Sequence, residues 1–514
     1  MTVEKYFIGV DVGTYESKGV ITDLHGHIIA SRTMKHTLSV PRPGWAEHDP
    51  EGVWWNDVCA IIRGLLQTDG VSPKDIAAVC CSAVSCGIVA VDSDDRPLRP
   101  AILYGVDTRS TKEIDDIICE FGREKLIDIC GELPSVDSYG PKLLWLRRNE
   151  PEIFSAAARF TFAQGYINLR LTGRNFIDSY SVFFSTPLFN CSTRGWDAGM
   201  CRYILGEDGF ERLPQIAPPS SVIGTVTRRA AAETGLAEGT PVVCGATDAG
   251  SEALSVGVFE PGDTMVMYGS SLFINHVTPS VIIRNNPLWK AHFLFGDSGC
   301  VLAGMATTGS LTRWLRDNFT KDYLALEAQG SANAYDSLFA EADTVPPGSD
   351  GVFVLPYFAG ERMPIMDAGA KGMIFGLTLG HTRAHVIRAA LEGVGYGLRQ
   401  NFEVMRAMGC SPGRVTAVGG GTKSPEWMQI MSDVTGCEHC IPEIATGASF
   451  GDAMLCAAAV GAVSDLSELK RWNRIRSIVS PRSEYAGLYE RGSRIYRELY
   501  ENTRTLMHSV DELR

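Results

Sequence analysis

The chain contains two stretches in which an apolar strand ends in a tight turn rich in glycine, serine and threonine. The first covers residues 6–11 and breaks at Gly13-Thr14, and the second covers residues 263–268 and ends at 269–271. Apolar runs of this length, bounded by turn residues, predict buried strands. Because the same pattern opens each half of the chain, it predicts weak internal symmetry and a domain boundary near residue 255.

The length of 514 residues exceeds what one ordinary hydrophobic core supports, so two domains are expected, covering residues 1–255 and 256–514. After a three-stranded meander near the N-terminus, strands and helices alternate. The predicted strands are 76–82 and 88–92, and the predicted helices are 51–67, 112–119, 141–148 and, at the C-terminus, 485–499. The alternation indicates a mixed α/β fold.

Composition and charge argue against several classes of protein. The formal net charge of −13 is unfavourable for nucleic-acid binding, because affinity for phosphate backbones depends on lysine and arginine. No basic segment followed by a long apolar stretch begins the chain, and the longest run of small apolar residues, 453–463, is too short to span a bilayer. We therefore expect a cytoplasmic protein that binds neither nucleic acid nor membranes.

The 14 cysteines are scattered through apolar segments, as reduced core residues would be. Cys437 and Cys440 have the C-x-x-C spacing of redox and zinc sites, but no second ligand pair lies nearby in the sequence. The segment runs between Gly436 and Pro442, where a short strand would alternate its side chains. We interpret the pair as strand residues, with a chemical role as the alternative.

Both glycine turns have the chemistry of a phosphate site. Backbone N–H groups near Gly13 and Gly269 can bind phosphate oxygens, and Asp11 at its strand end can hold a hydrated Mg²⁺. The side-chain donors beside the turns are those of Thr14, Lys18, Ser270 and Ser271. Each turn alone is also what an ordinary hairpin requires. Two such turns, one opening each half, indicate a nucleotide whose phosphates are held from both sides.

Asp248 is a candidate general base. It ends the segment Gly245-Ala-Thr-Asp248, which follows an apolar strand and precedes a predicted helix at 249–257. A carboxylate at the carboxyl end of a buried strand points toward a cleft, where it can accept a proton from a substrate hydroxyl. The alternative is that Asp248 caps the helix, a position that aspartate also favours.

A third glycine-rich segment, 417–427, follows another apolar strand. Gly419, Gly420 and Gly421 leave room for a base or ribose near the backbone, and Ser424-Pro-Glu has the pattern of a capped helix start. Neither the dinucleotide pattern G-x-G-x-x-G nor the P-loop pattern occurs in this segment. A nucleotide site here would therefore be of another type.

Together these segments resemble the FGGY family of carbohydrate kinases, and within it the xylulokinases most. The matching stretches follow the family's order and cover almost the whole chain. They are residues 11–18, 44–50, 245–248, 268–271, 303–309, 314–316, 360–364, 419–427 and 447–451. Each stretch is short, but their joint order and spacing are specific.

The resemblance implies an α/β fold of two ribonuclease-H-like domains of the actin and hexokinase superfamily, with a cleft between them. It implies ATP as phosphate donor and Mg²⁺ as metal ion, with Asp11 and Asp248 as metal-binding residues and Asp248 as the catalytic base at the sugar. The phosphates would lie at Gly13, Thr14 and Lys18 and at Gly269, Ser270 and Ser271. The nucleotide pocket would be formed by Gly309, Gly420, Gly421, Thr422 and Ser424.

The resemblance is weaker on the sugar side. Where xylulokinases have Gly-Gln-Met-His-Gly this chain has Ala-Val-Ser85-Cys86-Gly, and Tyr104-Gly-Val-Asp107 replaces Trp-Asn-Asp. Ser85, Cys86 and Asp107 lie in loops after predicted strands, where α/β proteins bind ligands, and we expect them to contact the sugar. The alternatives are that Cys86 fills the core and that Asp107 caps a helix.

The expected activity is ATP-dependent phosphorylation of a hydroxyl of a small sugar, with a ketopentose such as D-xylulose as the leading substrate. A kinase of another polyol, an acid sugar or a signalling sugar is the alternative within the family. A regulatory or non-catalytic actin-like ATPase is the alternative outside it, although Asp248 in its Gly-Ala-Thr-Asp setting argues against that reading. The implied partners are the sugar and ATP, with a homodimer as a further option.

Overall fold

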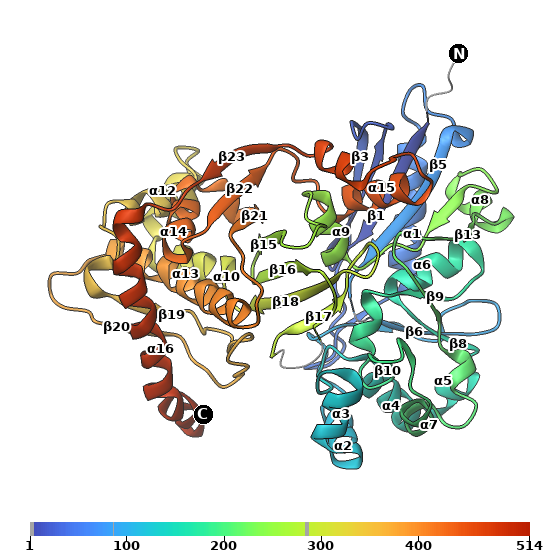
Figure 1. Cartoon of the computed structure of the whole chain (residues 1–514), viewed down its shortest axis with the longest axis horizontal. Coiled ribbons are helices and arrows are strands. Elements are labelled where there is room, and N and C mark those ends of the chain that lie inside the picture. The colour runs from blue at the N-terminus through green and yellow to red at the C-terminus, as the bar shows by residue number, and fades with distance from the viewer. Residues whose placement is uncertain (1–4, 86, 283–286, 514) are drawn as a thin grey trace.

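The computed structural model describes residues 5–85, 87–282 and 287–513. It contains one large sheet in each half of the chain (Figure 1). The first has the strand order β13-β14-β5-β1-β2-β3. Its strands are β1 (Tyr6–Val12), β2 (Glu16–Thr22), β3 (Ile28–Lys35), β5 (Ile76–Ala83), β13 (Val222–Thr225) and β14 (Pro241–Val243).

The second sheet has the order β17-β18-β16-β15-β21-β22-β23. Its strands are β15 (Thr264–Tyr268), β16 (Leu272–Thr278), β17 (Trp289–His292), β18 (Gly299–Met305), β21 (Arg414–Val418), β22 (Glu438–Pro442) and β23 (Ile475–Val479). In both sheets the opening strand has antiparallel-paired strands on one side, two in the first sheet and three in the second. On the other side it has two parallel strands followed by an antiparallel edge strand. The internal symmetry expected from the two strand–turn stretches is therefore present in the sheets.

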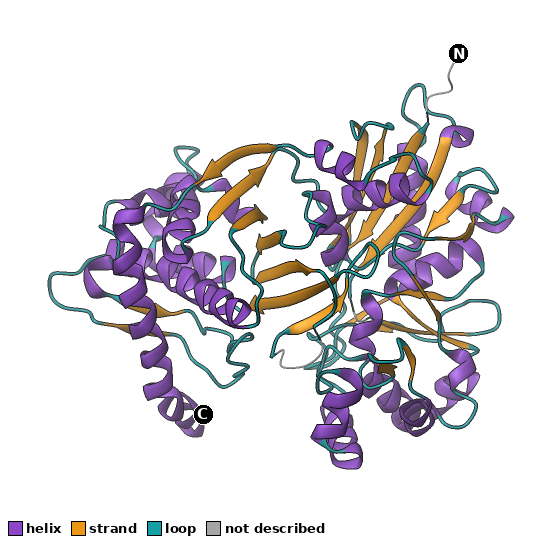
Figure 2. Ribbon diagram, in the orientation of Figure 1, coloured by secondary structure: helices purple, strands orange, loops and turns teal. Residues whose placement is uncertain are grey.

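Smaller sheets and helices surround these strands in both halves (Figure 2). The remaining strands are β4 (Glu47–His48), β6 (Ile88–Val91), β7 (Ala101–Ile102), β8 (Arg159–Phe162), β9 (Phe176–Asp178), β10 (Phe189–Asn190), β11 (Gly195–Trp196), β12 (Gln215–Ala217), β19 (Phe353–Leu355) and β20 (Met373–Phe375). The helices of the first half are α1 (Asn56–Leu65), α2 (Thr111–Phe121), α3 (Arg123–Cys130), α4 (Tyr139–Asn149), α5 (Pro151–Ala156), α6 (Ala163–Thr172), α7 (Ala198–Leu205), α8 (Arg228–Thr234) and α9 (Asp248–Ser255). Those of the second half are α10 (Gly309–Phe319), α11 (Lys321–Ala328), α12 (Ala334–Asp343), α13 (Arg383–Ala407), α14 (Pro425–Thr435), α15 (Ala448–Ala459) and α16 (Ala486–Ser509).

Helix α15 belongs to the second half of the sequence but packs on the first sheet, against β1, β5 and α9 (Figure 1). The contact is close because β1 carries Gly9, where a Cβ would lie 1.9 Å from the carbonyl oxygen of Ser449. Buried residues of both halves, among them Phe7, Met265 and Phe450, form one continuous apolar cluster. A division at residue 255 stays a prediction from the sequence, and α15 shows that the packing around the first sheet crosses it.

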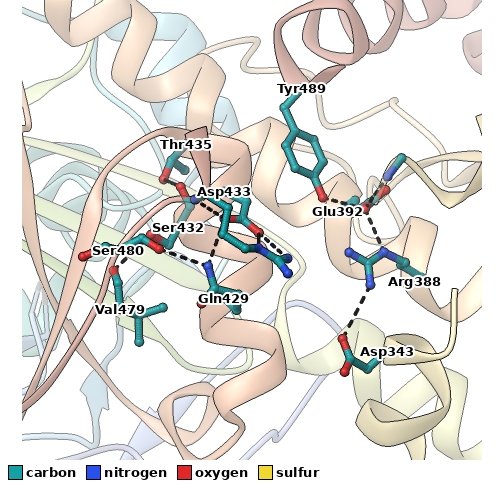
Figure 3. Close-up of polar contacts among 12 residues, drawn as sticks. Asp343, Arg388, Glu392, Gln429, Ser432, Asp433, Thr435, Val479, Ser480 and Tyr489 are labelled. Atoms are coloured by element: carbon teal, nitrogen blue, oxygen red, sulfur yellow. Dashed lines mark hydrogen bonds and ion pairs between the residues drawn. The ribbon is translucent and has the colours of Figure 1, made fainter. Parts of the chain in front are cut away.

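The C-terminal helix α16 extends the amphipathic helix predicted at 485–499 and is anchored to α13 by a buried polar cluster (Figure 3). Glu392 accepts hydrogen bonds from Arg388 Nε at 3.0 Å and from the Tyr489 hydroxyl at 2.9 Å. It also accepts one from the Ser349 hydroxyl at 2.9 Å. A buried carboxylate with this many donors is stabilised in place, so α16 is fixed to the second half.

Of the two cysteines with C-x-x-C spacing, one lies in a strand, as the sequence favoured, and the other lies just before it. Cys440 lies in β22 and Cys437 directly precedes it, and both side chains are buried. The Cys437 thiol donates to the carbonyl of Pro412 at 3.2 Å. The cysteines within the described ranges are all free thiols, and no helix among the described residues is apolar over a length that would cross a membrane.

Candidate active site

A cavity of about 370 Å³ lies between the two large sheets. The first half contributes Asp11, Thr14, Val84, Ser85, Tyr104, Asp137, Tyr180, Phe184, Asp248, Ala249 and Glu252 to its lining. The second half contributes Met267, Ser271, Phe273, Trp289, Arg362 and Ala448. Of the predicted site residues, the cavity therefore brings together Asp11, Thr14, Ser85, Asp248 and Ser271.

The parallel strands of the first sheet bring the carboxylates into the cavity. Strands β1 and β5 pair Asp11 with Ser82, and Ala83 pairs with Thr247, the residue before Asp248. Because the carboxyl ends of parallel strands meet at one edge of a sheet, Asp11 and Asp248 come to the same edge. Asp248 is the first residue of α9, and its Oδ1 accepts a hydrogen bond from the backbone N–H of Ala249 at 2.8 Å.

Three carboxylates of the cavity have pKa values well above the ordinary range. Burial raises the pKa of Asp11 to about 6, against the opposing effects of the Ser82 hydroxyl and the Lys18 charge. Burial, and then the charge of Asp11, raise the pKa values of Asp248 and Glu252 to about 7. Desolvated like charges that raise each other's pKa make the cavity attractive to a cation.

Glu252 is a cavity residue that the sequence analysis missed. It lies four positions after Asp248 on α9, and this spacing places both side chains on one face of a helix. The four-residue spacing from Asp248 was the sequence feature that could have predicted Glu252 as a site residue.

A network of buried hydrogen bonds connects Asp11 with α15. The Ser82 hydroxyl lies 3.0 Å from Asp11 Oδ1 and 2.7 Å from Oδ2 of Asp452, which comes from α15. Asp452 also accepts hydrogen bonds from the Ser82 backbone N–H at 3.0 Å and from the Ser251 hydroxyl at 2.6 Å. Burial raises the pKa of Asp452 well above its ordinary value. The position of Asp11 thus depends on a helix from the other half of the chain.

The first glycine turn is a tight hairpin between β1 and β2. The Gly13 N–H donates to the Glu16 carbonyl at 3.0 Å, and a Cβ at position 13 would lie 2.7 Å from that oxygen. Gly13, Thr14 and Lys18 line a second hollow beside the cavity, together with Asp11. Lys18 forms an ion pair with Glu16 at 2.7 Å. The predicted phosphate residues of the first half therefore lie side by side.

The second glycine turn is bound to the N-terminus of α10. The N–H of Gly309 donates to the Gly269 carbonyl at 2.9 Å, and the N–H of Ser310 donates to the Ser270 carbonyl at 3.0 Å. A Cβ at Gly309 would lie 2.6 Å from the Gly269 oxygen, so this approach requires glycine. The geometry explains why a glycine occurs at position 309, which the sequence showed only through a resemblance.

The third glycine-rich segment begins at the same edge of the second sheet. Strands β15 and β21 are parallel and pair Met267 with Val418, so the segment from Gly419 to Thr422 starts beside the second turn. Gly419 has a φ of +93°, and a Cβ there would lie 2.7 Å from the Tyr268 carbonyl oxygen. Ser424 is buried and caps α14 by accepting from the Trp427 N–H at 3.1 Å. Gly420, Gly421 and Thr422 therefore lie next to the second turn, whereas Ser424 holds the following helix.

The sugar-side predictions had mixed outcomes. Ser85 lines the cavity, and Cys86 lies outside the described residues. Asp107 is not among the lining residues. Its side chain is fully buried, forms an ion pair with Arg109 at 2.6 Å and accepts from the Ala46 N–H at 2.7 Å. The expectation that Asp107 meets a sugar hydroxyl does not agree with this geometry, because its oxygens are already bound by Arg109 and by the Ala46 N–H.

Asp137 takes the place in the cavity that was expected for Asp107. It lies in the loop between α3 and α4, lines the cavity and faces Gly105, where a Cβ would lie 2.4 Å from its Oδ1. The rest of this wall is aromatic, with Tyr104, Tyr180, Phe184, Phe273 and Trp289. Carboxylates beside aromatic faces suit a small molecule that has both hydroxyl groups and C–H surface.

Comparisons with known proteins agree with this architecture. The N-terminal domain of the FGGY family of carbohydrate kinases matches residues 6–255, and its C-terminal domain matches residues 265–460. The chain is 27% identical to a xylulose kinase of Bacillus subtilis over 99% of both proteins, and 30% identical to a gluconokinase of the same species over 90% of both. A crystal structure of xylulose kinase from Rhodospirillum rubrum superimposes with a TM-score of 0.89 at 31% identity, covering 98% of this chain and all of that one.

These likenesses confirm the predicted fold of two actin- and hexokinase-like domains. Since the two family domains together span most of the sequence, the chain belongs to the FGGY family of carbohydrate kinases.

Proposed function

We propose that this enzyme transfers the γ-phosphate of ATP to a hydroxyl group of a small uncharged sugar, with D-xylulose as the leading substrate. Membership of the family implies ATP as co-substrate. The observation that carries the proposal is the position of Asp248, whose carboxylate lines a cavity between two glycine turns suited to phosphate. Xylulose is favoured because several of the similar proteins are xylulose kinases.

Asp248 would act as the general base. Burial raises its pKa to about 7, and a base is most effective when its pKa is close to the working pH. The carboxylate would orient the attacking sugar hydroxyl and accept its proton as the phosphate is transferred. Phosphoryl transfer otherwise depends mainly on positioning and charge neutralisation, which is consistent with a site that contains one well-placed base.

The carboxylates of the cavity fit a magnesium ion. Among the described ranges, no set of three or more His, Cys, Asp or Glu side chains is arranged to hold a metal alone. Magnesium in phosphoryl-transfer enzymes is bound by one or two carboxylates and by the substrate's phosphates, so such a set is not required. Asp11 and Asp248 would hold the ion, whose charge would offset that of the phosphates. Activity undiminished in excess chelator would overturn this assignment.

The nucleotide would lie across the two glycine turns. The N–H groups and side chains of Gly13, Thr14 and Lys18 would meet the phosphates from the first half, and residues 269–271 would meet them from the second. Gly309 and the segment 420–422 would leave space for the rest of the nucleotide. Ser424 would act indirectly, because its hydroxyl caps α14 and so fixes the segment before it.

The charge of the cavity favours a neutral sugar over an acid sugar. Its lining contains the carboxyl groups of Asp11, Asp137, Asp248 and Glu252, and a single guanidinium group, that of Arg362. A sugar carboxylate would meet unfavourable like charges there, whereas sugar hydroxyls can donate to these oxygens. We assign the recognition of the sugar to Ser85 and Asp137, with Asp107 supporting the loop through Arg109.

A screen of ADP release tests the proposal. D-xylulose, D-ribulose, xylitol, glycerol and gluconate are offered with Mg·ATP, and the specificity constants are compared. We expect the highest value for a neutral ketose or polyol and the lowest for gluconate. A preference for gluconate would overturn the assignment of a neutral sugar, and the absence of sugar-dependent ADP release would overturn the proposed activity.

A further inference from the structure

Tyr104 connects the wall of the cavity with the first glycine turn. Its ring lines the cavity with Asp137 and Asp248, and its hydroxyl oxygen lies 3.0 Å from Oγ1 of Thr14. The two residues are 90 positions apart, so the contact is made by the fold and not by a local turn. Tyr104 therefore lies between the region that would hold the sugar and the turn that would hold phosphate.

Thr14 belongs to both hollows. It lines the cavity, and it also lines the second hollow, which Gly13, Lys18 and Lys35 help to form beside the turn. A threonine hydroxyl has one hydrogen to donate and can accept a hydrogen bond at the same time. When Tyr104 donates to Thr14, the hydrogen of Thr14 is available to a phosphate oxygen. When Thr14 donates to Tyr104, that hydrogen is taken.

A sugar hydroxyl can select the first arrangement. If it donates to the Tyr104 oxygen, the Tyr104 hydrogen turns toward Thr14, and the Thr14 hydrogen turns toward the phosphate. Hydrogen bonds that run in one direction along a chain strengthen one another. Burial and the charge of Asp248 raise the pKa of Tyr104, so its hydroxyl keeps the hydrogen that this chain requires.

We propose that Tyr104 is a positioning residue that couples sugar binding to phosphate binding through Thr14. A tryptophan at this position could not do so, because an indole N–H donates but has no acceptor to pass a hydrogen bond on. The inference rests on the proposed function, since it needs a sugar and a nucleotide bound in the same cleft.

Calorimetric binding measures the coupling directly. A non-hydrolysable ATP analogue is titrated into the protein with and without saturating sugar, using the sugar of the substrate screen with the highest specificity constant. In the wild type the sugar is expected to tighten nucleotide binding about fivefold, the worth of one neutral hydrogen bond. The nucleotide must tighten sugar binding by the same factor, because coupling is reciprocal. Tyr104→Phe keeps the ring, removes the hydroxyl and should bring both factors close to one.

Two control variants show whether the hydroxyl pair is responsible. Thr14→Ser keeps a hydroxyl at position 14 and is expected to keep the coupling. Tyr203→Phe makes the same chemical change at a tyrosine that packs on Phe121, outside the cavity lining, and should leave the coupling unchanged. Coupling of wild-type size in Tyr104→Phe, or none in the wild type, would overturn the inference and leave the kinase activity standing. A wild type that binds nucleotide but no sugar would overturn the proposed function as well.

Discussion

The two glycine turns face the same cleft but are held in different ways. Backbone groups hold the turn of the second half, where Gly309 and Ser310 donate to the carbonyls of Gly269 and Ser270. The turn of the first half combines backbone hydrogen bonds, such as that from the Gly13 N–H to the Glu16 carbonyl, with contacts from side chains of other segments. His36 Nε2 lies 3.1 Å from the Gly13 carbonyl oxygen, and Tyr104 lies against Thr14.

This difference separates a fixed turn from an adjustable one. Contacts between backbone groups are set by the fold and do not change with protonation. The histidine contact depends on pH, and the tyrosine contact depends on what occupies the cavity. We therefore expect the first turn to respond to pH and to bound ligands more than the second.

The largest effect is expected from Gly309→Ala, which would break the fixed turn. The added Cβ would lie 2.6 Å from a backbone oxygen, which cannot move aside as a flexible side chain can. Displacement by about one ångström of the turn proposed to bind phosphate costs on the order of a hundredfold in catalytic efficiency. Steady-state kinetics should show this loss in kcat/KM for ATP.

Gly413→Ala is the matched control for this change, because nothing lies within 4 Å of a Cβ at that position. It should behave as the wild type. A Gly309→Ala protein that folds normally by circular dichroism and keeps its efficiency with ATP would show that the second turn is not fixed in the way described.

A smaller effect on sugar binding should distinguish Asp137 from Asp107, the two aspartates near the cavity wall of the first half. Asp137→Asn is expected to raise the Michaelis constant for the sugar roughly tenfold, the scale of one hydrogen bond to a charged group, and to leave that for ATP unchanged. Asp107→Asn should leave both constants unchanged. It should instead lower the free energy of unfolding by about 2 kcal/mol, the scale of a hydrogen bond between charged groups, because Arg109 loses one of its two carboxylate partners and keeps the other, Glu47 at 2.9 Å. Denaturant unfolding and kinetics measured on both variants check these expectations, and a sugar effect confined to Asp107→Asn would reverse the assignment.

The smallest predicted effect is a pH dependence of the first turn. The Nδ1 of His36 lies 2.9 Å from Asp57 Oδ2, and its Nε2 faces the Gly13 carbonyl, so both nitrogens donate only when the ring is protonated. Burial alone would lower the pKa of His36, but the bond and charge of Asp57 and the Gly13 carbonyl raise it above its ordinary value. The stabilisation is therefore complete below about pH 6.5 and is lost as the pH rises through the raised pKa.

Binding of an ATP analogue should accordingly weaken about fivefold on the alkaline side, the scale of one hydrogen bond. His48, which packs edge-on against His36, has its pKa lowered to about 4 by burial and by the charge of His36, so it stays neutral throughout this range. His36→Gln should bind the analogue with an affinity that does not change over the same range. An unchanged pH dependence in that variant would remove His36 from the control of the turn.

The parts of this site that could be predicted are those that follow from the residue pattern of a single short segment. The strands β1 and β15, both glycine turns and Asp248 follow from apolar runs and turn residues. The four-residue spacing of Asp248 and Glu252 indicates that both side chains lie on one face of a helix, but Glu252 was not predicted as a site residue. Asp137 had no local pattern, because its loop reaches the cavity only through the packing of α4.

The placement of Asp107 away from the cavity lining has a physical cause. A position after a strand predicts a loop, but it does not say in which direction the side chain points. The guanidinium of Arg109 and the N–H of Ala46 bind its oxygens, and the second of these partners is 61 positions away. The contact between Tyr104 and Thr14 could not be predicted either, because the two residues belong to segments that are distant in the sequence.

The most direct test of the account is single-turnover phosphorylation by Asp248→Asn, with Mg·ATP and the sugar of the substrate screen with the highest specificity constant. The substitution keeps the size of the side chain and removes its ability to accept a proton. The account predicts a rate at least about a hundredfold lower than that of the wild type, with binding of the ATP analogue largely intact. A rate close to that of the wild type would contradict it and remove Asp248 from the chemistry.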